Sequence, residues 1–190
     1  MKKLKFILLI SFTIIGFISK ASAQDSYIVK SHEVIIIGTS NIHEWTAQVV
    51  KLSGLAKSTS SAINDVNITV DAKTLKSSKG KIMDSKMQDA LKTEKYPTIY
   101  YKSLSNTLLS EKNGVMNILT TGNLTISGVT KNIKVITTCR KVQNENFEVL
   151  GSFYILMTNF NIEPPTALFG ALTTADKINI TYKIVFQKLK

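Results

Sequence analysis

The clearest strand pattern in this chain is Lys177-Ile178-Asn179-Ile180-Thr181-Tyr182-Lys183-Ile184-Val185-Phe186. Apolar residues occupy every second position from Ile178 to Phe186, and most residues between them are polar. Successive side chains of a β-strand point to opposite faces, so alternation places all the apolar ones on one face. The pattern therefore predicts a strand with one buried face and one face toward water.

The same alternation recurs along the chain, as in Val66, Ile68, Val70 and Ala72. It predicts further strands over residues 26–37, 42–55, 65–72, 97–104, 115–126, 131–140 and 147–157. Turn signals fall between the apolar runs: Ser53-Gly54, Asn113-Gly114, Ser127-Gly128 and Gln143 to Asn146. Regular strands with short turns, and no repeated strand–helix unit, predict an antiparallel barrel or sandwich.

One segment, residues 80–96, departs from alternation. Its apolar residues follow helical spacing: Ile82, Met83, Met87, Ala90 and Leu91. Asp84 can cap this helix and Pro97 stops it. The segment thus predicts a short amphipathic helix between two strands. The helix either plugs one end of the sheet as core or uses its adaptable methionines as a lid over an apolar ligand.

Residues 1–23 have the pattern of a secretory signal peptide. A basic stub, Met1 to Lys5, precedes an apolar run, Phe6 to Ile18, and a small-residue cleavage pattern, Ala21-Ser22-Ala23. That run of about 13 residues is shorter than the roughly 20 that span a bilayer as a helix. We expect export to the periplasm, a mature chain with no transmembrane segment, and one domain over residues 24–190.

Net charge and cysteine content argue against several classes of function and site. The net charge is +11, which falls to +7 without the four lysines of the predicted signal peptide. The lysines are dispersed singly and Arg140 is the only arginine, so binding of nucleic acid is not expected. Cys139 is the single cysteine, which excludes an internal disulfide and a thiolate metal cluster. Cys139 continues an apolar strand face, so we expect a buried thiol.

Motifs for catalysis are absent. His32 and His43 are each followed by a glutamate, but adjacent strand residues point to opposite faces, so His43 and Glu44 cannot meet without a bulge. No zinc-protease, nucleophile-elbow, phosphate-loop or dinucleotide motif occurs. We therefore predict no enzyme, no metal and no cofactor. A hydrolase or isomerase that uses His43 with a carboxylate from another strand is the remaining catalytic alternative.

Four motifs occur in the order found in one family: Gly38 to Trp45, Met87 to Leu91 with Tyr96 to Ile99, Gly122 to Lys131, and Phe160 with Pro165 to Gly170. In these motifs the chain resembles the YceI-like family of exported, lipocalin-like proteins over nearly its whole mature length. The resemblance implies an all-β fold, an eight-stranded antiparallel barrel. It also implies an apolar interior that holds a polyisoprenoid chain, such as a quinone tail or prenyl lipid, in the bacterial periplasm.

We therefore expect a binding or carrier protein for a long apolar lipid. The residues expected to bind it are the inward-facing Tyr101, Phe153, Met157 and Tyr182 and the mouth residues Trp45, Phe160 and Phe169. An eight-stranded barrel can either fill itself with side chains or hold one small ligand. An envelope stress or interaction protein with a filled barrel is therefore the alternative. Exposed surface at the mouth would also permit a homodimer.

Overall fold

The computed structural model describes residues 24–59 and 62–189. The predicted signal peptide lies outside these residues. The strands and the α-helix are β1 Asp25–Ser40, β2 Glu44–Gln48, β3 Leu52–Thr59, β4 Ala62–Asp71, β5 Lys76–Ser77, α1 Lys81–Ala90, β6 Thr98–Lys112, β7 Val115–Ile126, β8 Val129–Lys141, β9 Phe147–Leu156, β10 Thr166–Ala167 and β11 Leu172–Lys188. Short 3-10 helices are η1 Ala72–Thr74, η2 Gln143–Glu145, η3 Met157–Phe160 and η4 Leu168–Gly170.

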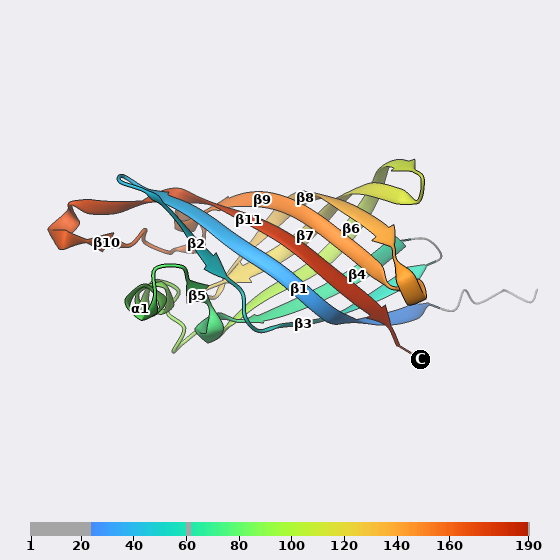
Figure 1. The fold of residues 1–190 in the computed structure, drawn as a ribbon, viewed down its shortest axis with the longest axis horizontal. Coiled ribbons are helices and arrows are strands. Elements are labelled where there is room, and N and C mark those ends of the chain that lie inside the picture. Colours follow the sequence, from blue (N-terminus) through green and yellow to red (C-terminus); the bar gives the residue numbers. More distant parts are fainter. Residues whose placement is uncertain (1–23, 60–61, 190) are drawn as a thin grey trace, which may run out of the picture.

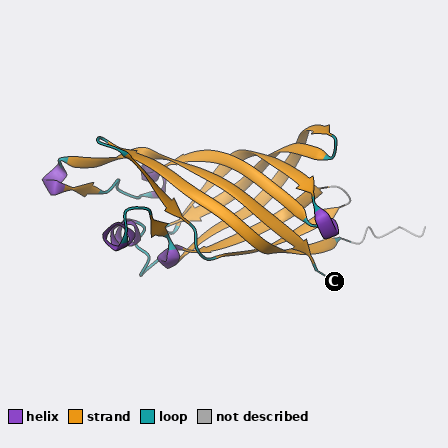
Figure 2. Ribbon diagram, viewed as in Figure 1, coloured by secondary structure: helices purple, strands orange, loops and turns teal. Residues whose placement is uncertain are grey.

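The strands form a closed antiparallel barrel with eight positions around its wall (Figures 1 and 2). The order around the wall is β1, β3, β4, β6, β7, β8, β9 and β11, and β11 pairs again with β1. Strand β2 shares the position of β3, because both pair with β1: β2 with residues 35–39 and β3 with residues 25–28. The predicted eight-stranded barrel with one helix between strands is confirmed.

The predicted alternation determines which side chains fill the barrel. On β11, Ile184 and Phe186 are buried whereas Lys183 is exposed. At the end of the barrel where β11 finishes, the buried rings of Tyr27 and Phe147 meet edge to face, with centroids 5.2 Å apart. These two packed rings therefore fill that end of the barrel interior. The opposite end carries α1, β5 and β10 (Figure 1).

Two of the predicted turns are tight hairpins. Asn113 and Gly114 join β6 to β7, and Ser127 and Gly128 join β7 to β8. All four residues have positive φ, between 50° and 78°. Positive φ at both central residues is typical of the type I′ turn, whose twist matches that of the flanking strands.

The prediction for residues 42–55 was wrong in extent. The strand is interrupted at residues 49–51, between β2 and β3, and Ser53-Gly54 lies inside β3 rather than in a turn. A Cβ on Gly54 would lie within 3.0 Å of the side chain of Ile68 on the neighbouring strand. Glycine therefore allows close packing of the two strands here. In the sequence, a glycine in this role looks the same as a glycine in a turn.

The helix also differs from its prediction in two respects. It ends at Ala90 instead of continuing to Tyr96, and Lys92 in the turn that follows has φ 52°. Asp84 does not cap the helix. Gly80 occupies the N-cap position without a side-chain hydrogen bond, and the Asp84 carboxylate instead accepts the N–H of Ser77 from β5. No helix in the described ranges is long and apolar enough to cross a membrane.

Candidate ligand-binding cavity

An internal cavity of about 270 Å³ lies inside the barrel. All eight wall positions contribute side chains to its lining, and most of these side chains are aliphatic or aromatic. At its end of the barrel, helix α1 contributes Met83, Lys86, Met87 and Ala90 to the lining. The volume is close to the lower limit of small-molecule sites, which span roughly 300 to 1,000 Å³. The barrel is therefore not filled by its own side chains.

Three inward aromatic rings each occupy the space beside a glycine of the wall. Their pairs are Trp45 over Gly38, Tyr101 over Gly122 and Tyr182 over Gly151. A Cβ at any of these glycines would come within 3.0 Å of the ring. Rings that cover glycines on neighbouring strands are a recognised means of stabilising a curved sheet. Here the arrangement also keeps three large side chains close to the wall.

Tyr101, Phe153 and Tyr182 form an aromatic region in the lining. The rings of Phe153 and Tyr182 meet edge to face with centroids 6.3 Å apart. The Tyr182 hydroxyl and the Thr137 hydroxyl share a hydrogen bond of 2.8 Å, which satisfies both buried groups. Burial raises the pKa of Tyr182, and burial followed by the proximity of Tyr182 raises the pKa of Tyr101. Both phenols therefore stay neutral, and this region carries no negative charge.

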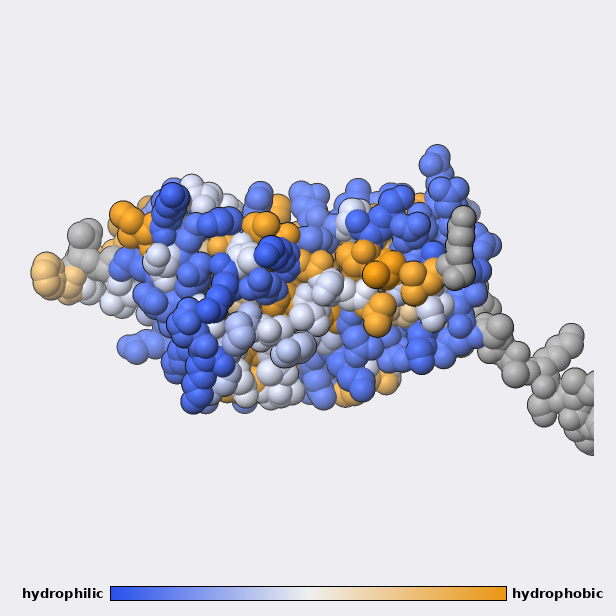
Figure 3. Space-filling view, turned by 90° about the horizontal axis from the view of Figure 1, so that it is seen from below, coloured by the Kyte–Doolittle hydropathy of each residue, from blue (hydrophilic) through white to orange (hydrophobic). Residues whose placement is uncertain are grey.

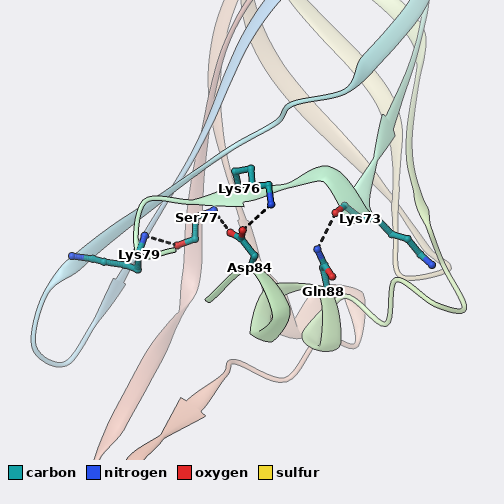
Figure 4. Close-up of polar contacts among 6 residues, drawn as sticks. All are labelled: Lys73, Lys76, Ser77, Lys79, Asp84 and Gln88. Atoms are coloured by element: carbon teal, nitrogen blue, oxygen red, sulfur yellow. Dashed lines mark hydrogen bonds and ion pairs between the residues drawn. The ribbon is translucent and has the colours of Figure 1, made fainter. Parts of the chain in front are cut away.

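Polar contacts attach α1 to the strand segment that precedes it (Figure 4). Asp84 accepts the backbone N–H of Ser77 at 2.6 Å and the Lys76 ammonium at 3.0 Å. Gln88, one turn further along α1, donates its amide to the backbone carbonyl of Lys73 at 2.9 Å. The Ser77 N–H bond, followed by the Lys76 bond, holds the pKa of Asp84 below its ordinary value. The carboxylate thus stays charged and fixes α1 over the cavity.

Charge is nearly absent from the cavity. Among the described residues of the lining, Lys86 is the only charged one. It is half-buried on α1, where its ammonium can reach the water outside while its methylenes cover apolar surface. The arrangement suits an apolar molecule and places the one cation of the described lining at the α1 end.

The structure places five of the seven expected ligand-binding residues in the lining: Trp45, Tyr101, Phe153, Met157 and Tyr182. Phe160 is not in the lining. It is 1% exposed in η3 and packs in a core cluster with Ile162 and Met157. Phe169 is fully exposed in η4. The structure thus brings the inward candidates together with Trp45, places Phe160 in the core beside Met157, and leaves Phe169 apart from them.

Sequence reasoning did not assign several residues of the lining. Met83 and Met87 of α1 were considered for a lid, and both line the cavity, as does Leu91 just after the helix. Lys86 was missed, although it lies three residues after Met83 and four before Ala90, a spacing that places it on the same face of the helix. Apolar wall residues such as Ile68 follow the alternation that predicted their strands. The alternation predicts which residues face the interior of the barrel, but it does not predict whether a cavity remains between them.

The residues considered for chemistry lie apart from one another. His43 is exposed in the turn between β1 and β2, where its Nδ1 lies 3.0 Å from the Ser40 hydroxyl, and it does not line the cavity. Cys139 is a buried free cysteine, as expected, and burial raises the pKa of its thiol. Within the described ranges no three His, Cys, Asp or Glu residues are grouped to hold a metal ion.

Comparisons with known proteins agree on the fold. A family model described as the YceI-like domain matches residues 25–186. No curated protein matches the chain by sequence. Among solved structures, BcnA of Burkholderia cenocepacia is 20% identical with a TM-score of 0.65, over 81% of this chain and 95% of BcnA. A polyisoprenoid-binding domain from Saccharophagus degradans, implicated in plant cell wall breakdown, is 12% identical with a TM-score of 0.70, over 86% of this chain and 98% of that domain. A Campylobacter jejuni YceI protein is 18% identical with a TM-score of 0.61, over 76% of this chain and 84% of that protein.

Proposed function

Because the chain belongs to the YceI-like family, we propose that it is a periplasmic binding protein that carries a long apolar lipid, a polyisoprenoid or quinone-type chain, inside the barrel. The observation that carries the proposal is the apolar cavity, lined from every wall position of the barrel. The polyisoprenoid-binding domain with the same fold supports this class of ligand. The signal-peptide pattern of residues 1–23 supports the periplasmic location.

The physical chemistry of the cavity favours binding over catalysis. Its phenols are neutral, and the one charged group of the described lining, Lys86, lies at the α1 end. Transfer of a five-carbon isoprene unit from water yields roughly 4 kcal/mol, at about 0.8 kcal/mol per carbon. Association costs several kcal/mol, so a few enclosed units reach micromolar affinity, about −8 kcal/mol. Such a site needs shape and apolar surface more than polar contacts.

A pair of variants on one strand tests this function. Ile180 lines the cavity, and its neighbour Asn179 is exposed on the outer face of β11. Ile180→Trp adds volume inside the barrel, whereas Asn179→Trp adds the same ring outside. Native mass spectrometry of the protein isolated from its own periplasm should show lipid bound to the parent and to Asn179→Trp, and little or none on Ile180→Trp.

The melting temperatures complete this test. In a barrel with a ligand cavity, Ile180→Trp occupies empty volume and the melting temperature changes little. In a filled core the same change would overpack and cost about 1–3 kcal/mol. A parent protein that carries no lipid, together with a sharply destabilised Ile180→Trp, would show that the proposed function is wrong.

A further inference from the structure

We propose that the α1 end of the barrel docks on the surface of an anionic phospholipid bilayer, through exposed apolar tips and the lysine-rich segment that contains α1. This interaction surface consists of Ile42, Ile82 and Phe169, with the lysines of residues 73–95. The inference goes beyond ligand binding, because it concerns the outer surface and stands whether or not the cavity is occupied. The same end of the barrel carries the α1 residues that line the cavity.

The apolar tips come from three separate segments. Ile42 lies in the turn between β1 and β2 and is 70% exposed, Ile82 on α1 is 77% exposed, and Phe169 in η4 is fully exposed. All three segments lie at one end of the barrel (Figure 1). Exposed large apolar side chains are costly to leave in water, so three of them at one end of the barrel favour an interaction site there.

Hydrogen bonds hold two of these tips together. The Asn41 amide donates to the carbonyl of Ala171 at 2.8 Å, and the Thr173 N–H donates to the Asn41 side chain at 3.2 Å. The Asn41 N–H also donates to the Thr173 carbonyl at 3.1 Å. Ile42 and Phe169 therefore project from hairpins that are fastened to each other. Fixed tips lose little conformational entropy when they enter a membrane interface.

The segment that contains α1 carries a net positive charge. Residues 73–95 contain seven lysines and three acids. Two of the acids are already paired, Glu94 with Lys73 and Asp84 with Lys76. Figure 3 shows hydrophobic residues at the tip of this end and hydrophilic residues behind it. Lysines behind an apolar tip complement the negative phosphates that overlie the acyl chains of an anionic membrane.

Binding to lipid vesicles tests whether the lysines near α1 attract an anionic bilayer. Sedimentation with vesicles of two-thirds phosphatidylcholine and one-third phosphatidylglycerol should retain the protein, and retention should fall with salt. Vesicles of phosphatidylcholine alone should retain much less. Reversing the exposed lysines, in Lys79→Glu with Lys81→Glu, should weaken binding at least about tenfold, since each lysine near the surface contributes about fivefold. Equal binding to both kinds of vesicle, or no binding to either, would overturn the proposal.

Insertion of the tip is tested with tryptophan fluorescence. Phe169→Trp should shift its emission to the blue and gain intensity when the anionic vesicles are added, because the indole enters an apolar region. The matched control is Tyr154→Trp, which changes an exposed aromatic of β9 on the side of the barrel and should show no shift. No shift at position 169, or an equal shift at both positions, would contradict docking by this end. Both changes are on exposed side chains, so the folded barrel is retained.

Discussion

Gly151 determines where the ring of Tyr182 lies. The two residues are cross-strand partners on β9 and β11, and the ring occupies the space of the missing Cβ. Gly151→Ala should push the ring into the cavity and break its hydrogen bond with Thr137. We expect a loss of about 1–3 kcal/mol in unfolding free energy, typical of overpacking, and a clear loss of bound lipid. Denaturant unfolding and native mass spectrometry measure the two effects.

A second substitution separates this mechanism from a general effect on β9. In a Tyr182→Leu background the ring is gone, so Gly151→Ala should cost much less than in the parent. The double-mutant cycle gives the coupling energy between the two positions. Coupling near zero would show that the Gly151→Ala effect does not act through Tyr182.

The contribution of Glu148 to the unfolding free energy depends on pH. It is 6% exposed and forms ion pairs with Arg140 and, at 3.1 Å, with Lys183. Burial alone would raise the pKa of Glu148, but the hydrogen bonds from Lys183 and Arg140 outweigh it and the pKa is lowered. A lowered folded-state pKa stabilises the fold above the unfolded-state value, about 4.3, and this stabilisation is lost as pH falls through the folded-state value.

Glu148→Gln should therefore lower the unfolding free energy by about 1–2 kcal/mol at pH 7, from the loss of charged hydrogen bonds. The difference from the parent should shrink as pH falls below 4, where the parent carboxylate becomes protonated. Glu33→Gln, on an exposed position of β1, is the control and should leave stability unchanged. A difference between Glu148→Gln and the parent that stays constant down to pH 2 would contradict the ion-pair explanation.

Among the elements, α1 depends on one carboxylate for its attachment. Asp84→Ala removes the acceptor for Ser77 N–H and for Lys76. Alanine is the best helix former, so the substitution does not weaken the helix itself. We expect the amides of α1 to exchange hydrogen faster while those of the barrel wall keep their protection. Asp89→Ala, at an exposed position of the same helix, should leave the exchange unchanged. Equal acceleration in both variants would show that Asp84 does not hold the helix in place.

How far the sequence predicts these elements depends on the range of the interactions. Alternation predicts β11 well because each residue reports its own face, and Ser127-Gly128 predicts a hairpin because the turn needs only local backbone geometry. Gly54 and Asp84 were misread for the opposite reason. Their partners, Ile68 and Ser77, lie on other elements, so the signal that each gives depends on the packed fold.

At the scale of the whole molecule, the sequence predicted an apolar site inside the barrel but only some of the residues that line it. The inward aromatics Tyr101, Phe153 and Tyr182 follow from strand faces. Phe160 and Phe169 could not be placed, because both lie in 3-10 helices, where the alternation of strand faces no longer applies. The proposed docking surface was also hidden, because Ile42 and Phe169 join the lysines of residues 73–95 at one end of the barrel only when the chain folds.

The seam between β1 and β11 joins the two ends of the described chain, from Tyr27 opposite Lys188 to Ser40 opposite Thr174. Contacts between residues so distant in sequence must overcome the entropy of closing a long loop, and folds dominated by such contacts fold slowly. Until the last strand arrives, β1 presents an unpaired edge beside an apolar inner face, a surface prone to aggregation. The barrel therefore closes only after β11 has been made, and a chain that stops before Leu172 lacks the strand that completes the wall.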